Sequence, residues 1–130
     1  MEFEIRVLHV VPVLLLSSSA ASAYEPYMNL GQGVICDTLK QVERFAALRS
    51  EGKNAEGALQ AVNNDITGHN ACAFALVKFT GANPVASLSI NGKPASVLEI
   101  TVHAFNNGAA WNEISATVQY ILVPEKGLIA

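Results

Sequence analysis

The sequence predicts an α+β domain in which a helical hairpin packs against one face of a four-stranded antiparallel sheet, with one disulfide bond. Three observations lead to this fold class. Apolar residues recur at helical spacing between residues 37 and 62, and apolar and polar residues alternate in most of the chain after residue 71. The third observation is a pair of cysteines, Cys36 and Cys72, which lie on either side of the helical region.

The N-terminus has the pattern of a signal peptide. An apolar run over residues 7–16 is followed by a cluster of serines and alanines that ends in Ala21-Ser22-Ala23, which fits the small-residue rule for cleavage. A membrane-spanning helix needs about 20 apolar residues, and this run is shorter. We therefore expect residues 1–23 to be removed, which leaves a single small domain, residues 24–130, in the periplasm or outside the cell.

Two acidic residues, Glu2 and Glu4, depart from the positive charge that is usual at the start of such a leader. This departure leaves open whether the assigned start codon is correct. No cysteine follows the apolar run, so a lipid anchor is not predicted.

The two cysteines are expected to form one disulfide, since two thiols allow a single pairing and the compartment predicted by the leader is oxidising. Closing this loop would stabilise the domain by roughly 3 to 4 kcal/mol in the chain-entropy treatment. A redox pair or a metal–thiolate site is the less favoured alternative, because the spacing is not Cys-x-x-Cys and no histidine stands at ligand spacing; the nearest is His69.

Charge and composition exclude several classes of partner. The whole chain has a formal charge of −3, and removal of two acidic residues and one basic residue with the leader changes it to −2. No basic stretch is present, so neither nucleic acid nor an anionic membrane surface is an expected partner. No cofactor motif, phosphate-binding loop or nucleophile elbow occurs either, and an enzyme is the least favoured class.

The helices are predicted from their caps and their periodicity. Asp37 is expected to cap the first helix, and Gly52 is expected to end it in the left-handed conformation that glycine tolerates. Asn54 is expected to cap the second helix, which continues to about Val62. Residues 24–33 contain proline and glycine without periodicity, which predicts an irregular segment, and residues 34–36 are expected to form a short strand or an extended lead-in.

Strands are predicted over residues 71–79, 85–90, 97–105 and 114–123. The pair Asn91-Gly92 would fit a two-residue turn, but that turn would put Leu88 and Leu98 on opposite faces of the sheet. We therefore expect an odd-length loop, a five-residue connection over residues 91–95 that sets Leu88 opposite Leu98 and keeps one apolar face. The opposite face is then expected to be polar and exposed, and to carry Ser87, Ser89, Glu99, Thr101, His103, Ser115, Thr117 and Gln119.

Several segments together resemble small exported proteins of uncharacterised function from rhizobia-like alphaproteobacteria. The resemblance is carried by Val34-Ile35-Cys36-Asp37-Thr38, Gln41-Val42-Glu43-Arg44-Phe45, Ala61-Val62-Asn63, Ala71-Cys72, residues 97–105, Trp111 and Val118-Gln119-Tyr120. It covers most of the chain after the leader. It implies a periplasmic or secreted bacterial protein, and it implies no activity, cofactor or catalytic residue.

The histidines and the tryptophan are the residues with the most chemical potential. His69 lies in a polar loop, where a solvated side chain is the favoured interpretation over a metal ligand or a base. Glu99 and His103 share a strand face, but their Cα atoms are about 13 Å apart at strand spacing, so they are not a dyad. Trp111 is interpreted either as a lid over the edge of the core or as an exposed aromatic on a binding loop.

These observations predict a small binding or accessory protein that acts on an envelope protein or a small ligand. The alternative is a proteinaceous inhibitor that inserts the loop over residues 106–112 into an envelope-directed hydrolase. The candidate binding surface comprises Thr101, His103, Asn106, Asn107, Trp111, Thr117 and Gln119. No metal or cofactor is expected, and neither the identity of the partner nor the oligomeric state follows from the sequence.

Overall fold

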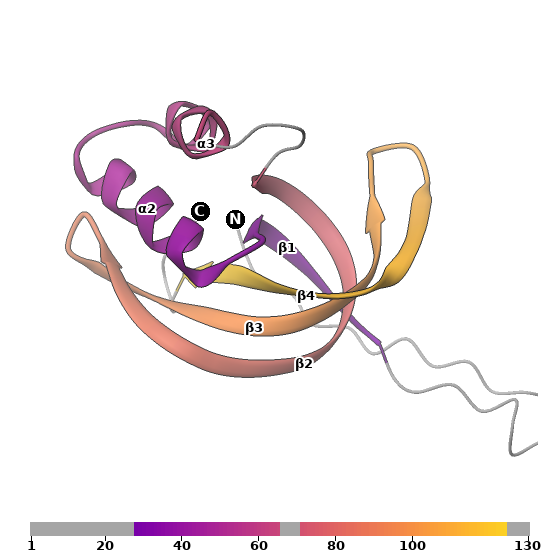
Figure 1. The fold of residues 1–130 in the computed structure, drawn as a ribbon. Helices are drawn as coiled ribbons and strands as arrows, with labels where there is room; N and C mark the ends of the chain where they lie inside the picture. Colours follow the sequence, from indigo (N-terminus) through magenta and orange to yellow (C-terminus); the bar gives the residue numbers. More distant parts are fainter. Residues whose placement is uncertain (1–27, 66–70, 125–130) are drawn as a thin grey trace, which may run out of the picture.

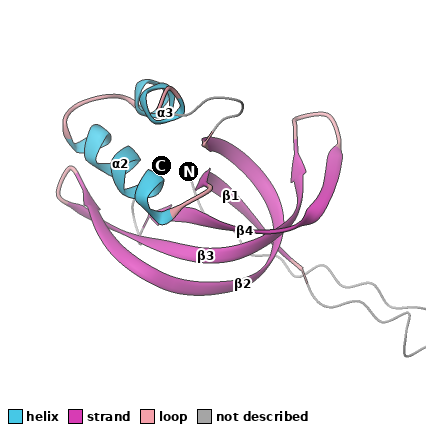
Figure 2. Ribbon diagram, in the orientation of Figure 1, coloured by secondary structure: helices cyan, strands magenta, loops and turns pink. Residues whose placement is uncertain are grey.

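Two helices packed on a four-stranded antiparallel sheet make up the part of the chain that the computed structural model describes, residues 28–65 and 71–124. The elements in chain order are β1 (Asn29–Cys36), α2 (Leu39–Ser50), α3 (Ala55–Asn63), β2 (Cys72–Ile90), β3 (Lys93–Asn106) and β4 (Trp111–Pro124). The predicted α+β fold class is confirmed (Figures 1 and 2). The predicted signal peptide and His69 lie outside the described residues.

Local sequence explains the helix ends. The N-cap of α2 is Thr38, one residue after the predicted Asp37, because Thr38 and Gln41 exchange side-chain hydrogen bonds with each other's backbone N–H groups in a capping box. Gly52 has a φ of 109°, and its N–H donates to the carbonyl of Arg49, so the predicted left-handed end is confirmed. Asn54 caps α3 as predicted, by accepting from the N–H of Gly57 at 2.7 Å.

The helices bury one face of the sheet, which we call the helix face. Val42, Phe45 and Leu48 of α2 and Ala58 and Val62 of α3 project toward it. The sheet contributes buried side chains from all four strands, namely Val34, Cys36, Cys72, Ala95, Val97 and Leu122. Figure 1 shows both helices together on one side of the curved strands. The hairpin is therefore held by apolar burial from two elements that would be marginal as isolated helices.

The order of the strands is β1-β2-β3-β4, and the sheet closes on itself because β1 pairs with both β2 and β4. The ladder between β1 and β2 runs from Asn29 opposite Phe79 to Cys36 opposite Cys72, whereas the ladder between β1 and β4 spans only Val34 to Cys36. The prediction of an irregular segment up to residue 33 was therefore wrong for its last residues.

The number of strands was predicted correctly, but two of the strands were assigned incorrectly. The predicted strands over residues 71–79 and 85–90 are two ends of β2, a single strand of 19 residues. Its pairing with β3 continues through register shifts between Thr80 and Asn83 and between Pro84 and Ala86. Gly81 and Pro84 mark these bulges, where the sequence indicated a break.

The hairpin between β2 and β3 corrects the predicted register. Asn91 and Gly92 form a two-residue turn with φ values of 53° and 81°, so that Ile90 pairs with Lys93 and Leu88 pairs with Ala95. The predicted five-residue loop was wrong, because the prediction assumed that only one face of the sheet is buried.

A second apolar cluster occupies the other face, which we call the inner face. It consists of Ile35, Val77, Phe79, Ile100, Val102 and Ile121, each with 5% or less of its surface exposed. All six residues belong to strands, and no helix residue contributes to the cluster among the described residues. The strands therefore bury this face by curving around it, which the closed order of the sheet makes possible.

The predicted disulfide is formed between Cys36 and Cys72, which are directly opposite each other in the ladder between β1 and β2. The bond lies beneath the helices, and both cysteines are buried. No helix within residues 28–65 or 71–124 is long and apolar enough to cross a membrane.

Candidate binding cavity

The structure divides the predicted binding surface between the two faces of the sheet. Ile100 pairs with Gln119, whereas Thr101 pairs with Val118. Because directly paired residues point to the same side, Gln119 lies on the inner face with Ile100, and Thr101 lies on the opposite side. The prediction that Thr101 and Gln119 share a polar face was wrong, since the observed pairing places Val118 and not Gln119 on the side of Thr101.

Thr117 and His103 also lie on different sides of the sheet, since Thr117 is paired with Val102 and His103 contacts Thr80, the partner of Thr101. Thr117 is exposed and pairs with Val102, an inner-face residue. His103 lies at an irregularity between Val102 and Ala104, and its Nε2 is 2.9 Å from the Oγ1 of Thr80 on the neighbouring strand. The histidine is partly buried and hydrogen-bonded to a threonine, which gives it a structural partner.

Glu99 is hydrogen-bonded to Tyr120 and His103 to Thr80, which agrees with the prediction that Glu99 and His103 form no dyad. The hydroxyl of Tyr120 donates to Oε2 of Glu99 at 3.1 Å. This hydrogen bond, followed by burial and by repulsion from the carboxylate, raises the pKa of Tyr120 above its ordinary value. Tyr120 and Glu99 therefore form a pair of their own, separate from His103.

The two asparagines of the predicted site hold the loop between β3 and β4 in shape. Oδ1 of Asn106 accepts from the N–H of Gly108 at 2.7 Å. Oδ1 of Asn107 accepts from the N–H groups of Ala109 and Ala110 at 2.9 and 3.1 Å. Both side-chain oxygens are thus used within the turn, as is common for asparagine in loops.

Trp111 fits neither of its two sequence interpretations. It is the first residue of β4, opposite Asn106, and it is partly buried without belonging to either core cluster. The ammonium of Lys78 lies 4.5 Å from the centroid of its ring, which is cation–π geometry. The tryptophan therefore packs on the outside of the sheet under a lysine.

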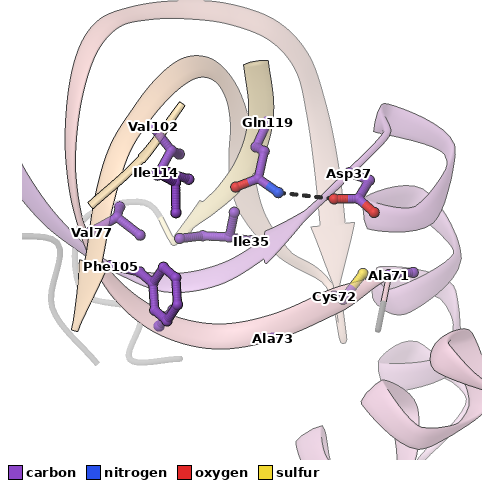
Figure 3. A pocket seen from close by; sticks show the side chains of 11 residues that line it. Ile35, Asp37, Ala71, Cys72, Ala73, Val77, Val102, Phe105, Ile114 and Gln119 are labelled. Carbon is purple, nitrogen blue, oxygen red and sulfur yellow. Dashed lines mark hydrogen bonds between the residues drawn. The ribbon is translucent and has the colours of Figure 1, made fainter. Parts of the chain in front are cut away.

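A cavity of about 240 Å³ opens from the inner face, at the end of the sheet where β1 leads into α2 (Figure 3). Its walls come from all four strands. The lining residues are Ile35, Asp37, Ala71, Cys72, Ala73, Ala75, Val77, Val102, Phe105, Ile114 and Gln119. Nine of these eleven are apolar or cysteine, so the interior offers mainly dispersion contacts.

The rim of the cavity exposes two large apolar side chains. Phe105 and Ile114 are each 38% exposed, and both line the cavity. The pairing of β3 with β4 passes from Val102 opposite Thr117 to Ala104 opposite Glu113, so residues 114–116 have no partner in this ladder. At this irregularity, the side chain of Ile114 need not follow the alternating pattern of a regular strand. Figure 3 shows it pointing toward Val77 and Ile35.

The polar end of the cavity is formed by Asp37 and Gln119. The Nε2 of Gln119 donates to Oδ1 of Asp37 at 2.9 Å, and the backbone N–H of Asp37 donates to the carbonyl of Ala71 at 2.9 Å. In Figure 3 the carbonyl oxygen of Gln119 points away from Asp37, on the side of Val102 and Ile114. The sequence indicated Asp37 only as a helix cap, because its contact with Gln119 joins segments that are 82 residues apart.

A second cavity, of about 430 Å³, lies between α2 and α3 and is lined by Lys40, Gln41, Arg44, Ala47, Val62 and Asp65. The Nε of Arg44 is 2.6 Å from Oδ2 of Asp65, and both side chains are about half exposed. Lys40 adds a second cationic side chain to this lining, beside the ion pair. No group of three or more potential metal-ligating side chains occurs within the described ranges.

Comparison with known proteins gives no family assignment. No protein-family model, no curated protein and no solved structure matches the chain. The cavity on the inner face, with its apolar rim and its Asp37–Gln119 end, is therefore the feature on which a functional proposal can be built.

Proposed function

We propose that this protein is a small exported binding protein whose inner-face cavity holds a compact, mainly apolar ligand. The observation that carries the proposal is the exposure of Phe105 and Ile114 at the rim of an apolar cavity. Covering apolar surface is favourable by about 25 cal/mol per Å². A ligand that fills the cavity would remove both side chains from water.

The volume sets the size of the ligand. An apolar cavity of about 150 Å³ holds benzene, so 240 Å³ holds roughly ten non-hydrogen atoms at the same density. This volume lies below the range of about 300 to 1,000 Å³ that is usual for drug-sized ligands. An aromatic ring with a short substituent is a ligand of suitable size.

Cavity filling tests this function. Ala73 lines the cavity and pairs with Ile35, so Ala73→Leu should occupy part of the volume. Ala82 is exposed on the same strand and does not line the cavity, which makes Ala82→Leu the matched control. With 2-phenylethanol as the probe, we expect saturable shifts of the Ile35, Val102 and Ile114 methyl signals in the parent chain and in the control, and at least tenfold weaker binding by Ala73→Leu. Binding that is absent, or that both variants retain equally, would contradict the proposal.

The loop over residues 107–110 supports the second candidate function, inhibition of an envelope-directed hydrolase. Four hydrogen bonds from the two asparagine side chains and the backbone of Asn107 hold this exposed loop in one shape. A loop that is rigid before binding loses less entropy when it enters a cleft. Capture of the chain's partners from an envelope extract separates the two functions, since an inhibitor should retain a hydrolase and abolish its activity.

Export is part of the same proposal. The formed Cys36–Cys72 bond supports an oxidising compartment. If the leader is cleaved after Ala23, the intact mass of the protein recovered from the periplasm or medium corresponds to residues 24–130. A product that keeps Met1 and stays in the cytoplasm would contradict both the cleavage site and the location.

A further inference from the structure

We propose that the ligand of the inner-face cavity carries a hydrogen-bond donor, as a small aromatic alcohol does, and that this donor binds Oε1 of Gln119 while the ring fills the apolar part of the cavity. This inference rests on the proposed function and specifies the chemical class of its ligand. Among the described side chains that line the cavity, Asp37 and Gln119 are the two that carry oxygen or nitrogen. These two residues therefore decide which polar group of a ligand is accepted.

The first step of the argument concerns the orientation of the Gln119 amide. Its Nε2 is 2.9 Å from Oδ1 of Asp37, and a carboxylate oxygen accepts hydrogen bonds and does not donate them. The NH₂ group of the amide therefore faces Asp37, and Oε1 faces away from it. Figure 3 shows this oxygen on the side of Val102 and Ile114, which line the cavity. The amide thus presents an acceptor to the apolar part of the cavity.

The second step concerns the partners of this oxygen. Within residues 28–65 and 71–124, the hydrogen bond of the Gln119 side chain is the one from Nε2 to Asp37, and no residue donates to Oε1. The oxygen is also not closed off from solvent, so water hydrates it in the ligand-free protein. A ligand that covers Oε1 without donating to it leaves a desolvated acceptor, which is unfavourable, whereas a hydroxyl replaces the lost water. The cavity therefore favours a donor over an acceptor of the same size.

The third step concerns how the amide is held. Asp37, which orients Gln119, follows Cys36 directly, and its N–H donates to the carbonyl of Ala71, the residue before Cys72. The disulfide between these two cysteines ties both segments together. The direction of Oε1 is therefore set before a ligand arrives, which lowers the entropy lost on binding.

Two isomers of the same formula test the inference on the disulfide-intact chain: 2-phenylethanol, whose hydroxyl donates, and benzyl methyl ether, whose oxygen only accepts. Calorimetry or methyl NMR titration gives the affinities. We expect the alcohol to bind about tenfold more tightly than the ether, because the ether leaves Oε1 of Gln119 desolvated and unpaired. Gln119→Met removes this acceptor from a side chain of similar length, so it should abolish most of the preference for the alcohol.

Gln32→Met is the matched control, because it makes the same exchange at an exposed position on β1 that does not line the cavity. It should keep the full preference. If Gln119→Met impairs folding, nuclear Overhauser effects between 2-phenylethanol and the parent chain give a second measurement. The CH₂ group that carries the hydroxyl should lie beside the side-chain amide of Gln119, and the ring should lie beside the methyl groups of Ile35 and Ile114.

Two results overturn this inference and leave the proposed function standing, provided that binding remains sensitive to Ala73→Leu. One is equal affinity of the parent chain for the two isomers, and the other is a bound alcohol whose hydroxyl end lies away from Gln119. Failure of both isomers to bind overturns the inference and the proposed function together.

Discussion

Trp111 and Phe79 are two aromatic residues of the sheet that differ in burial, so truncation should affect the two very differently. Phe79 is fully buried in the inner-face cluster, whereas Trp111 is partly buried and contacts Lys78 from outside. We expect Phe79→Ala to lower the free energy of unfolding by about 3 to 5 kcal/mol and Trp111→Ala to lower it by about 1 kcal/mol. Urea unfolding of both variants measures this difference. A loss of 3 kcal/mol or more for Trp111→Ala would restore the interpretation of this residue as a core lid.

Tyr120 should make stability depend on pH in the alkaline range. Its hydrogen bond to Glu99 raises the pKa of the phenol in the folded state, so the neutral form is favoured there. The resulting stabilisation is complete below the unfolded pKa of about 10 and is lost as the pH rises through the higher folded value. Unfolding free energies measured from pH 8 to 11 should decline less steeply in Tyr120→Phe than in the parent chain. Identical slopes would show that the hydrogen bond is absent in solution.

At the scale of single residues, the sequence was informative where the determining partner is close in the chain. Gly52 and Asn54 were assigned correctly because a helix end depends on residues within one turn. The pairing of Asp37 with Gln119 had no local signature, and neither did the cavity that the two residues border.

The conformation of the turn between β2 and β3 can be tested by substituting Gly92. Gly92 has a φ of 81°, and a Cβ added there would meet no atom within 4 Å, so the cost of a side chain is conformational and not steric. We expect Gly92→Ala to destabilise the domain by about 1 to 2 kcal/mol. Asn91→Gly is the control, since glycine adopts the φ of 53° freely and should leave stability within about 0.5 kcal/mol. An unchanged stability of Gly92→Ala would indicate a different turn.

The assignment of residues to sheet faces failed because the prediction assumed one buried and one exposed face, whereas both faces of this sheet contain buried apolar residues. The alternation in β3 places Val97 under the helices and Ile100 in the inner-face cluster. A pattern in which both faces are apolar cannot specify which residues of β3 and β4 lie on the same side, so the wrong grouping of residues by face could not be detected from the sequence. The same error grouped Gln119 with Thr101.

For the molecule as a whole, the disulfide should contribute about as much to stability as one large, fully buried side chain. It closes a loop with a sequence separation of 36, for which loss of chain entropy in the unfolded state predicts about 4 kcal/mol. Cys36→Ser alone should therefore cost about as much as the double variant with Cys72→Ser, within the range of about 2 to 5 kcal/mol. Chemical denaturation of the three proteins measures this. Two alkylatable thiols in the native protein would contradict the bond itself.

The overall class was predictable because helical and strand periodicities occupy separate halves of the chain, and the disulfide was predictable because two cysteines allow one pairing. The closure of the sheet was not. Gly31 and Gly33 lie in β1, where glycine weakens the strand pattern, so the part of β1 that pairs with β2 was interpreted as irregular. Residues 34–36, which pair with β4, were predicted only as a short strand or extended lead-in, with no partner strand assigned. Without closure, the burial of the inner face and its cavity could not be inferred.

The pairing of β1 with β4 has a consequence for the order in which the chain folds. β1 precedes the other described strands in the chain, and its residue Val34 pairs with Leu122, near the end of β4. The helices, β1 and β2 can associate early, but one edge of β1 stays unpaired until β4 is available. Contacts between distant segments slow folding, because a large loop must be ordered before they form. During synthesis, the sheet therefore cannot close until β4 has left the ribosome.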